Sequence, residues 1–195
     1  MTPERATRAV YRAGRRGPAH HNDGHGFTLI ELMVCVAVLA VLATLAGPSF
    51  DSYLQRRRVE GLSMQLLSDW QFARTSVLAR SAPLRLSVYA PGSGPGGCYL
   101  LHSGAADACS CNGEIATCAA GTEVLRQEAL PASSRVRLSA NVGSMLLDPR
   151  LGTVTPGGSI EITGANGDAL KHVVSILGRV RVCASAGRWA GIAAC

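Results

Sequence analysis

One stretch near the start of the chain decides how the rest of the fold is organised: GFTLIELM, at residues 26–33. It opens an apolar run in which Glu31 is the only charged residue before Asp51. Since about 20 apolar residues are enough to cross a bilayer as a helix, residues 27–50 are expected to form a transmembrane helix. Residues 1–26 are polar and contain five arginines, which predicts that this end stays in the cytoplasm and that the rest is exported.

The position of Gly26 relative to the apolar run indicates how the chain is processed. In a secretory signal the small cleavage-site residue follows the apolar region, whereas Gly26 precedes it. Cleavage of the Gly26–Phe27 bond would remove the leader, keep the helix and make Phe27 the new N-terminus. This pattern, with Glu31 as the fifth mature residue, resembles the prepilin-peptidase signature of type IV pilins and type II secretion pseudopilins. The resemblance implies methylation of the new terminus and three partners: prepilin peptidase, the inner membrane and other pilin subunits.

Glu31 is the one carboxylate inside the expected membrane segment. On insertion scales such a group costs on the order of 2.5–3.5 kcal/mol at membrane depth, so it is expected to have a partner or a function. In the families it resembles, the partner is the free α-amine of a neighbouring subunit's first residue, here Phe27, so Glu31 is expected to act in assembly. The alternative is a Glu close to the helix start that reaches the interface and is favoured by the helix dipole.

Beyond the anchor, the hydrophobic pattern changes from helical to strand-like at Pro83. An amphipathic helix is expected over residues 51–82. Its apolar residues, together with the residue directly before it, form one stripe: Phe50, Leu54, Leu62, Leu66, Trp70, Ala73 and Val77. Alternation over 84–89 indicates a strand, and further strand candidates, separated by turn residues, are 98–102, 123–130, 135–139, 144–147, 159–163, 172–177 and 179–183. The expected fold class is α+β, with a long N-terminal helix packed on an antiparallel β-sheet head in a pilin-like periplasmic domain, residues 51–195.

The cysteines indicate an oxidising compartment. Cys35 lies in the apolar run, and the other six form an even set that is typical of disulfides: Cys98, Cys109, Cys111, Cys118, Cys183 and Cys195. Cys98 and Cys118 are expected to bond with Cys109 and Cys111, in an order that the sequence leaves open. A metal-binding module built on the same four thiolates is the alternative, but C-x-C with lone outer cysteines does not match zinc-site spacing, so no metal is expected.

The sequence contains little evidence for a catalytic site. His102 and His172 are the histidines outside the leader, and neither stands in a nucleophile or metal motif. GSGPGG at residues 92–97 matches a dinucleotide-binding pattern, but a strand-like segment follows it instead of the required helix. The chain is therefore expected not to be an enzyme and to need no cofactor.

Positive charge accumulates at the C-terminal end. The formal net charge is +6, and no acidic residue follows Asp168. Residues 178–183 read GRVRVC, and this alternation predicts that Val180 and Val182 face the core while Arg179 and Arg181 project from the opposite face.

A Cys183–Cys195 bond would close a loop that contains Arg188 and Trp189, which in the loop-entropy model stabilises the fold by about 3 kcal/mol. Arg179 and Arg181, supported by Lys171 and Arg188, suit contacts with phosphate, and Trp189 suits base stacking. The alternative is an edge strand whose charges discourage edge pairing.

The two ends of the chain together resemble the FimT and GspH branch of the pilins. The G-R-x-R pattern before two cysteines looks like the DNA-binding tail of FimT-type minor pilins, and DPRLGT at 148–153 is similar to the pattern shared by both groups. The resemblance implies a minor type IV pilin that binds DNA without sequence specificity for uptake in natural transformation. The alternative is a GspH-type pseudopilin of a type II secretion system with a structural role only.

Overall fold

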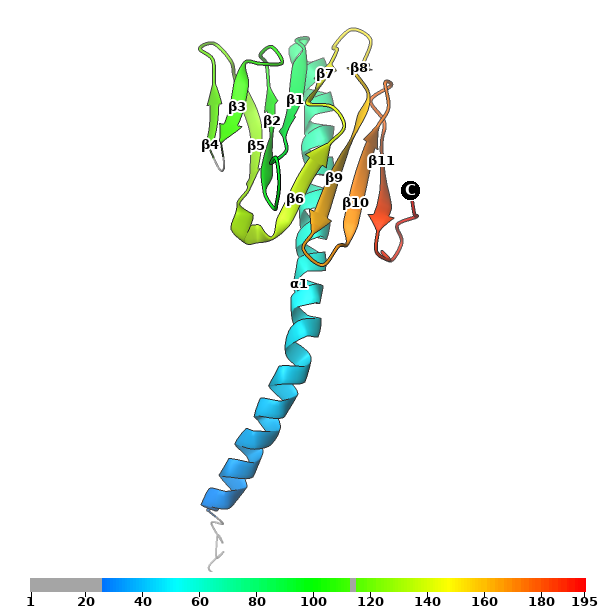
Figure 1. Cartoon of the computed structure of the whole chain (residues 1–195). Helices are drawn as coiled ribbons and strands as arrows, with labels where there is room; N and C mark the ends of the chain where they lie inside the picture. The colour runs from blue at the N-terminus through cyan, green and yellow to red at the C-terminus, as the bar shows by residue number, and fades with distance from the viewer. Residues whose placement is uncertain (1–25, 113–114) are drawn as a thin grey trace, which may run out of the picture. The chain divides into compact units, whose positions relative to one another are not determined.

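A computed structural model describes residues 26–112 and 115–195 of the protein, so the expected leader lies outside the described residues except for Gly26. A single long helix, α1 (Leu29–Arg80), is followed by short β-strands (Figure 1). The chain divides into two compact units, one ending at Ala43 and one running from Thr44 to Cys195. The observed class is α+β with a long N-terminal helix and antiparallel sheets, which confirms the predicted pilin-like fold.

The first turn of α1 is capped from within the GFTLIELM stretch. The backbone N–H of Glu31 donates a hydrogen bond to the Thr28 hydroxyl (3.3 Å), and that of Leu32 donates to the Thr28 carbonyl (3.2 Å). Thr followed three residues later by Glu is the pattern of a capping box, in which the N-cap side chain satisfies a free backbone donor. Thr28 therefore explains why the helix begins at Leu29.

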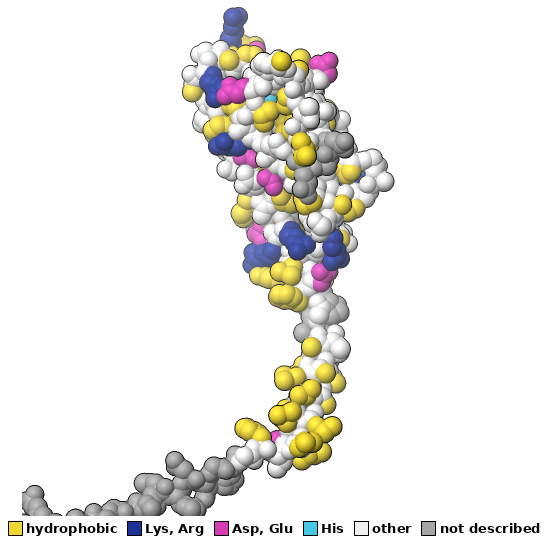
Figure 2. All heavy atoms as spheres, turned by 90° about the vertical axis from the view of Figure 1, so that its left-hand side faces the viewer, with side chains coloured by type: hydrophobic (Ala, Val, Ile, Leu, Met, Phe, Trp, Pro, Cys, Tyr) yellow, Lys and Arg dark blue, Asp and Glu magenta, His cyan; other side chains and the backbone are white. Residues whose placement is uncertain are grey.

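The exposed apolar residues of the N-terminal unit are nearly consecutive in sequence and so lie on every side of α1; Figure 2 shows those on one face. The exposed fractions run from 52% for Val38 to 78% for Leu29. A helix that is apolar all round requires apolar surroundings, either lipid or other helices. Among the described residues, no single helix passes a length and composition test for a membrane span, whereas residues 29–44 and 49–80 pass it when they are taken together.

The head is built from antiparallel sheets. The first contains β5 (Val124–Leu130), β2 (Gly97–His102), β1 (Leu84–Tyr89), β7 (Ser144–Leu147) and β8 (Val154–Thr155), in that order. The second contains β11 (Val180–Ala186), β10 (Ala169–Val174), β9 (Gly158–Gly164) and β6 (Val136–Ala140). The strands β3 (Cys109–Asn112) and β4 (Ile115–Cys118) form a separate two-stranded sheet. A 3-10 turn, Ala132–Ser134, precedes β6.

The second half of α1 provides one wall of the core. Its buried residues Val59, Leu66, Trp70, Ala73 and Val77 pack in one cluster with side chains of both large sheets. At 3.6 residues per turn these positions share one face of the helix, as predicted from Leu66 onward.

The start of the predicted stripe is wrong. Phe50 is 62% exposed and Leu54 is 37% exposed, whereas Gln55 and Val59 are 1% and 0% exposed. Each residue turns the helix by about 100°, so Leu54 lies off the face that carries Val59 and Leu66. Apolar character alone did not distinguish a residue that faces the sheets from one that faces outward.

The strand prediction for residues 172–177 is also wrong at both ends. β10 spans Ala169–Val174, and Ile176 and Leu177 lie in the turn that follows it. The pattern of apolar residues continues through this turn, so periodicity could not locate it. The turn is instead defined by a hydrogen bond from the Gly178 N–H to the Ser175 carbonyl (2.8 Å).

The two histidines of the head are buried. His172 is 1% exposed, and its Nε2 lies 3.1 Å from both the hydroxyl and the carbonyl oxygen of Ser63 on α1. His102 is 0% exposed, and its Nε2 lies 2.9 Å from the Ser87 hydroxyl. Burial lowers the pKa of both imidazoles, and the charge of Arg85 lowers that of His102 further.

This burial predicts an acid-sensitive head. Because the native pKa lies below the unfolded value of about 6.5, protons bind the unfolded chain first, so stability is lost as the pH falls below about 6.5. The slope contributed by each histidine cannot exceed about 1.4 kcal/mol per pH unit. Urea unfolding between pH 7.5 and pH 5 checks this as an expected loss, and His172→Gln should flatten the profile. A wild-type profile that is flat or rises toward pH 5 would contradict the prediction.

Candidate nucleic-acid interface

The turn between β10 and β11 is tied to the helix. The Ser175 N–H donates to the Arg179 carbonyl (2.9 Å), which closes the hairpin. From α1, the buried Trp70 indole N–H donates to the Gly178 carbonyl (3.2 Å). The turn therefore holds Arg179 at a fixed place beside α1.

Glycine is favoured at position 178 by its backbone conformation, and the space around it is tight. Its φ of 72° lies in the left-handed region that favours glycine. A Cβ atom here would lie 3.3 Å from the Gly152 carbonyl oxygen and 3.5 Å from the Arg74 Nε. The glycine of the G-R-V-R pattern thus allows the turn to approach α1 and the β7–β8 connection closely.

Arg181 lies on the outer face of the second sheet. It pairs with Val173, while Val180 and Val182 pair with Val174 and His172. Since directly opposed residues in an antiparallel pair share a face, the two valines point to the helix side with His172, as the alternation predicts. Arg181 is exposed on the other side.

Lys171 shares the outer face with Arg181 but has an acidic partner. It lies opposite Cys183, two residues from Arg181, and its Nζ is 3.7 Å from Glu161 Oε1 on β9. Both side chains are about one-third exposed (32% and 30%), so the pair reduces the field of Lys171 at this surface. Of the ion pairs between described residues, none involves Arg179, Arg181 or Arg188.

Arg188 and Trp189 lie at the far end of β11 from Arg179. The seven residues of β11 separate them, a length of about 20 Å at strand spacing. Trp189 is 8% exposed, its indole N–H donates to the Ala186 carbonyl (3.0 Å), and the Arg56 guanidinium carbon lies 4.6 Å from the centroid of its ring. This placement leaves little of the ring for base stacking, and the observed contacts anchor the C-terminal loop to α1.

The structure contains three disulfides. Cys183 bonds with Cys195. The Ala184 N–H donates a hydrogen bond to the Ala193 carbonyl (2.8 Å), and the Cys195 N–H donates to the Ala184 carbonyl (3.0 Å), so the chain end lies along β11. This covers part of an otherwise free sheet edge.

The central loop is crosslinked twice. Cys98 bonds with Cys111, and Cys109 bonds with Cys118 across the β3–β4 hairpin, which is one of the two orders that the sequence left open. Among residues 26–112 and 115–195, no cluster of His, Cys, Asp or Glu side chains is placed to hold a metal ion.

Spacing did not single out Arg74, which lies beside the β10–β11 turn, or Arg150, which lies in the neighbouring β7–β8 turn. Arg74 comes from α1, and Arg150 belongs to the β7–β8 turn, whose strand β8 is tied to the other turn by a hydrogen bond from the Val154 N–H to the Ile176 carbonyl (2.8 Å). No sequence signal predicts this, because these segments are brought together only by the packing of the sheets on α1.

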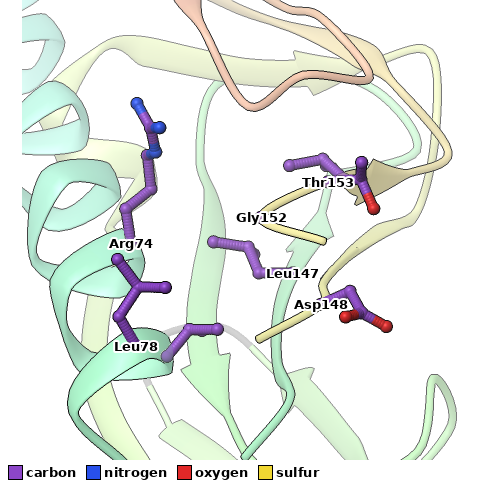
Figure 3. A pocket seen from close by; sticks show the side chains of 8 residues that line it. Arg74, Leu78, Leu147, Asp148, Gly152 and Thr153 are labelled. Carbon is purple, nitrogen blue, oxygen red and sulfur yellow. The ribbon is translucent and has the colours of Figure 1, made fainter. Parts of the chain in front are cut away.

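A small pocket separates the β7–β8 turn from the end of α1 (Figure 3). It is lined by Arg74, Val77, Leu78, Leu147, Asp148, Gly152, Thr153 and Val154. Its volume of about 40 Å³ is room for little more than a water molecule. This end of the head therefore presents a surface, with no cavity for a small organic ligand.

The arginine run at 56–58 is engaged within the head. Arg56 covers Trp189, and Arg57 donates to the Tyr53 hydroxyl (3.0 Å) and to Glu60 (2.8 Å). Arg58 donates to the Ser134 carbonyl (3.2 Å). These contacts account for the run without a nucleic-acid ligand.

The described chain begins with a Gly-Phe junction and a capped apolar helix, and the helix is followed by a head of antiparallel sheets. This arrangement defines a type IV pilin-like protein. Comparison with known families agrees. Residues 22–47 match the prokaryotic N-terminal methylation motif, and residues 62–178 match the type II transport protein GspH. Because the second match spans more than half of the chain, the protein belongs to the GspH family. This is a family of structural proteins rather than enzymes, and the first match covers the expected junction at Gly26–Phe27.

The chain is also similar to individual fimbrial proteins over short stretches. The chain is 50% identical over 40 residues to the type IV major fimbrial protein FimA of Dichelobacter nodosus, covering 20% of this chain and 25% of that protein. It is 45% identical over 38 residues to a fimbrial protein of Moraxella nonliquefaciens, with the same coverage of 20% and 25%. The chain thus spans about a quarter of the length of these relatives. No solved structure is a significant match.

The anchoring of Trp189 can be tested by removing the terminal disulfide. Cys195→Ser is expected to lower the free energy of unfolding by about 2–3 kcal/mol, because the loop closed by Cys183 is no longer constrained in the unfolded chain. It should also release Trp189 from Arg56. Acrylamide quenching of tryptophan fluorescence in the Trp70→Phe background, where Trp189 is the single tryptophan, measures this directly. Unchanged quenching would show that the packing on Arg56 holds the loop without the disulfide.

Proposed function

We propose that the protein is a minor type IV pilin whose head binds DNA for uptake in natural transformation. In this proposal residues 1–26 are the leader, residues 27–50 hold the chain in the bacterial inner membrane as a single span and then in the pilus, and residues 51–195 form the periplasmic head. Arg179 and Arg181 make the principal contacts with DNA phosphates. Lys171 and Arg188 contribute at longer range, and Trp189 supports the C-terminal loop instead of stacking on bases.

One observation carries the proposal: Arg179 and Arg181 stand exposed, two residues apart on one hairpin, and outside every ion pair between described residues. A folded chain rarely benefits from two neighbouring unpaired cations, since their mutual repulsion opposes folding. The arrangement suits a polyanion, because each neutralised phosphate releases counterions from DNA. The rigid turn above Trp70 reduces the ordering cost of binding.

Salt-dependent binding tests this function. The mature chain beginning at Phe27, in detergent, is expected to retain a short DNA duplex, and affinity should fall with salt at a log–log slope of about −3 if three or four phosphates are neutralised. Arg179→Ala with Arg181→Ala should make the slope shallower by about 2, because two phosphate contacts are lost. Fluorescence anisotropy at several salt concentrations gives both quantities.

Arg137→Ala is the matched control. Arg137 is exposed on β6, at the opposite edge of the same sheet from β11, so the substitution removes one positive charge without touching the hairpin. It should change the slope little. If the wild type shows no salt-sensitive retention, or the double variant binds as the wild type does, the DNA-binding function is wrong.

The second candidate is a pseudopilin of a type II secretion system with a structural role only. The family match favours it in one respect, since the matched residues end at Gly178, directly before the two arginines. Such a subunit would assemble through its helix and head and would not bind DNA. The same binding experiment separates the two candidates.

Assembly in either machine is proposed to depend on Glu31. Its carboxylate lies among exposed apolar side chains of α1, where the free α-amine of Phe27 from a neighbouring subunit would neutralise it. Glu31→Gln removes the charge and keeps the size, so cleavage after Gly26 should continue while incorporation into sheared pilus fractions falls at least severalfold. N-terminal sequencing and immunoblotting of the fractions give the two readouts. Equal incorporation would show that charge pairing is dispensable.

A further inference from the structure

The β10–β11 turn carries exposed apolar side chains that folding does not explain. Ile176 and Leu177 occupy its middle positions and are 65% and 59% exposed. Turn positions of this kind are normally occupied by polar residues or glycine. In the adjacent β7–β8 turn, Leu151 is 77% exposed. Exposed apolar residues that gather at one place mark a binding surface.

These residues and three arginines belong to neighbouring segments at one end of the head, which together we call the turn patch: Arg74, Arg150, Leu151, Ile176, Leu177 and Arg179. Two contacts hold its segments together. The Val154 N–H donates to the Ile176 carbonyl (2.8 Å), and the Gly152 carbonyl lies against Gly178. In Figure 3 the Arg74 side chain extends from α1 along the pocket beside this surface.

The charges of the turn patch define what it can bind. None of its arginines takes part in an ion pair between described residues. The nearby Asp148 carboxylate accepts hydrogen bonds from the backbone N–H groups of Arg150 (2.7 Å) and Leu151 (3.1 Å), so it is oriented toward its own turn and leaves three arginines against one carboxylate here. A second copy of the patch would oppose arginines with arginines. The fitting ligand has anionic groups around an apolar face.

Single-stranded DNA has this chemistry. Its phosphates are spaced along the strand, and its unpaired bases expose their faces, whereas a duplex hides those faces by stacking. Aliphatic side chains among arginines gain contact area only in the first case.

Resting on the proposed function, we propose that the turn patch binds single-stranded DNA. Arg74 and Arg150 extend the phosphate contacts of Arg179, while Ile176 and Leu177 pack against unpaired bases. The protein then prefers a single strand to a duplex of the same length.

The test compares an oligothymidine strand with a duplex of equal length, using the mature chain in detergent. The wild type is expected to bind the strand more tightly than the duplex at equal salt. Ile176→Ser with Leu177→Ser should weaken binding of the strand by about tenfold and leave duplex binding and the salt slope nearly unchanged. Arg74→Ala with Arg150→Ala should make the slope for the strand shallower by about 1.4, because each phosphate of a single strand contributes about 0.7. Circular dichroism and thermal unfolding confirm that the variants fold.

Ile115→Ser is the control for removing an exposed apolar side chain, since Ile115 is 71% exposed on β4, outside the turn patch. It should not change either affinity. If the Ile176/Leu177 variant binds both probes as the wild type does, the inference is overturned and the apolar residues belong to a protein contact. The proposed function would still stand if Arg179→Ala with Arg181→Ala abolishes duplex binding. Loss of strand binding in the patch variants, with duplex binding unaffected by the Arg179/Arg181 substitutions, would support the turn patch as the single-strand site and overturn the role of Arg179 and Arg181 in duplex binding.

Discussion

The head depends on one constraint: a single face of α1 must cover two separate sheets. Val59, Leu66, Trp70 and Val77 are all at most 3% exposed on that face, and the side chains that pack on them come from both large sheets. Trp70 does more than fill space, because its indole N–H reaches the Gly178 carbonyl. A buried indole donor left without a partner would cost roughly 1–3 kcal/mol, so the helix and the β10–β11 turn are specified together.

The packing of α1 on both sheets divides the arginines of the head into two groups. Near the start of the head helix they are used internally: Arg56 covers Trp189, Arg57 binds Glu60 and Arg135 binds Asp51 (2.9 Å). Such exposed pairs add little stability, but they neutralise charge. Where the β10–β11 turn meets α1, Arg74 and Arg179 remain outside the ion pairs of the described chain. Unpaired positive charge therefore remains where the β10–β11 turn meets α1.

Prediction from the sequence succeeded where the signal is local and failed where it depends on partners. The alternation at Val180–Cys183 assigned the faces of β11 correctly, because side-chain direction in a strand has a strict period of two. The sequence predicted base stacking by Trp189, whereas the structure buries its ring. Nothing near Trp189 in the sequence indicates that Arg56 packs on this ring. Likewise, Ile176 and Leu177 continue an apolar strand pattern, and only the hydrogen bonds of the turn separate them from β10.

The sequence by itself determined the apolar N-terminal helix, the α+β class and the number of cysteines available for disulfides. These follow from short-range chemistry: hydrophobic period and residue count. The tertiary structure decided the cysteine pairing, the burial of Trp189 and the approach of Arg74 and the β7–β8 turn to Gly178. These residues come from elements far apart in the chain, so their proximity depends on how two sheets pack on one helix, and no local pattern encodes that packing.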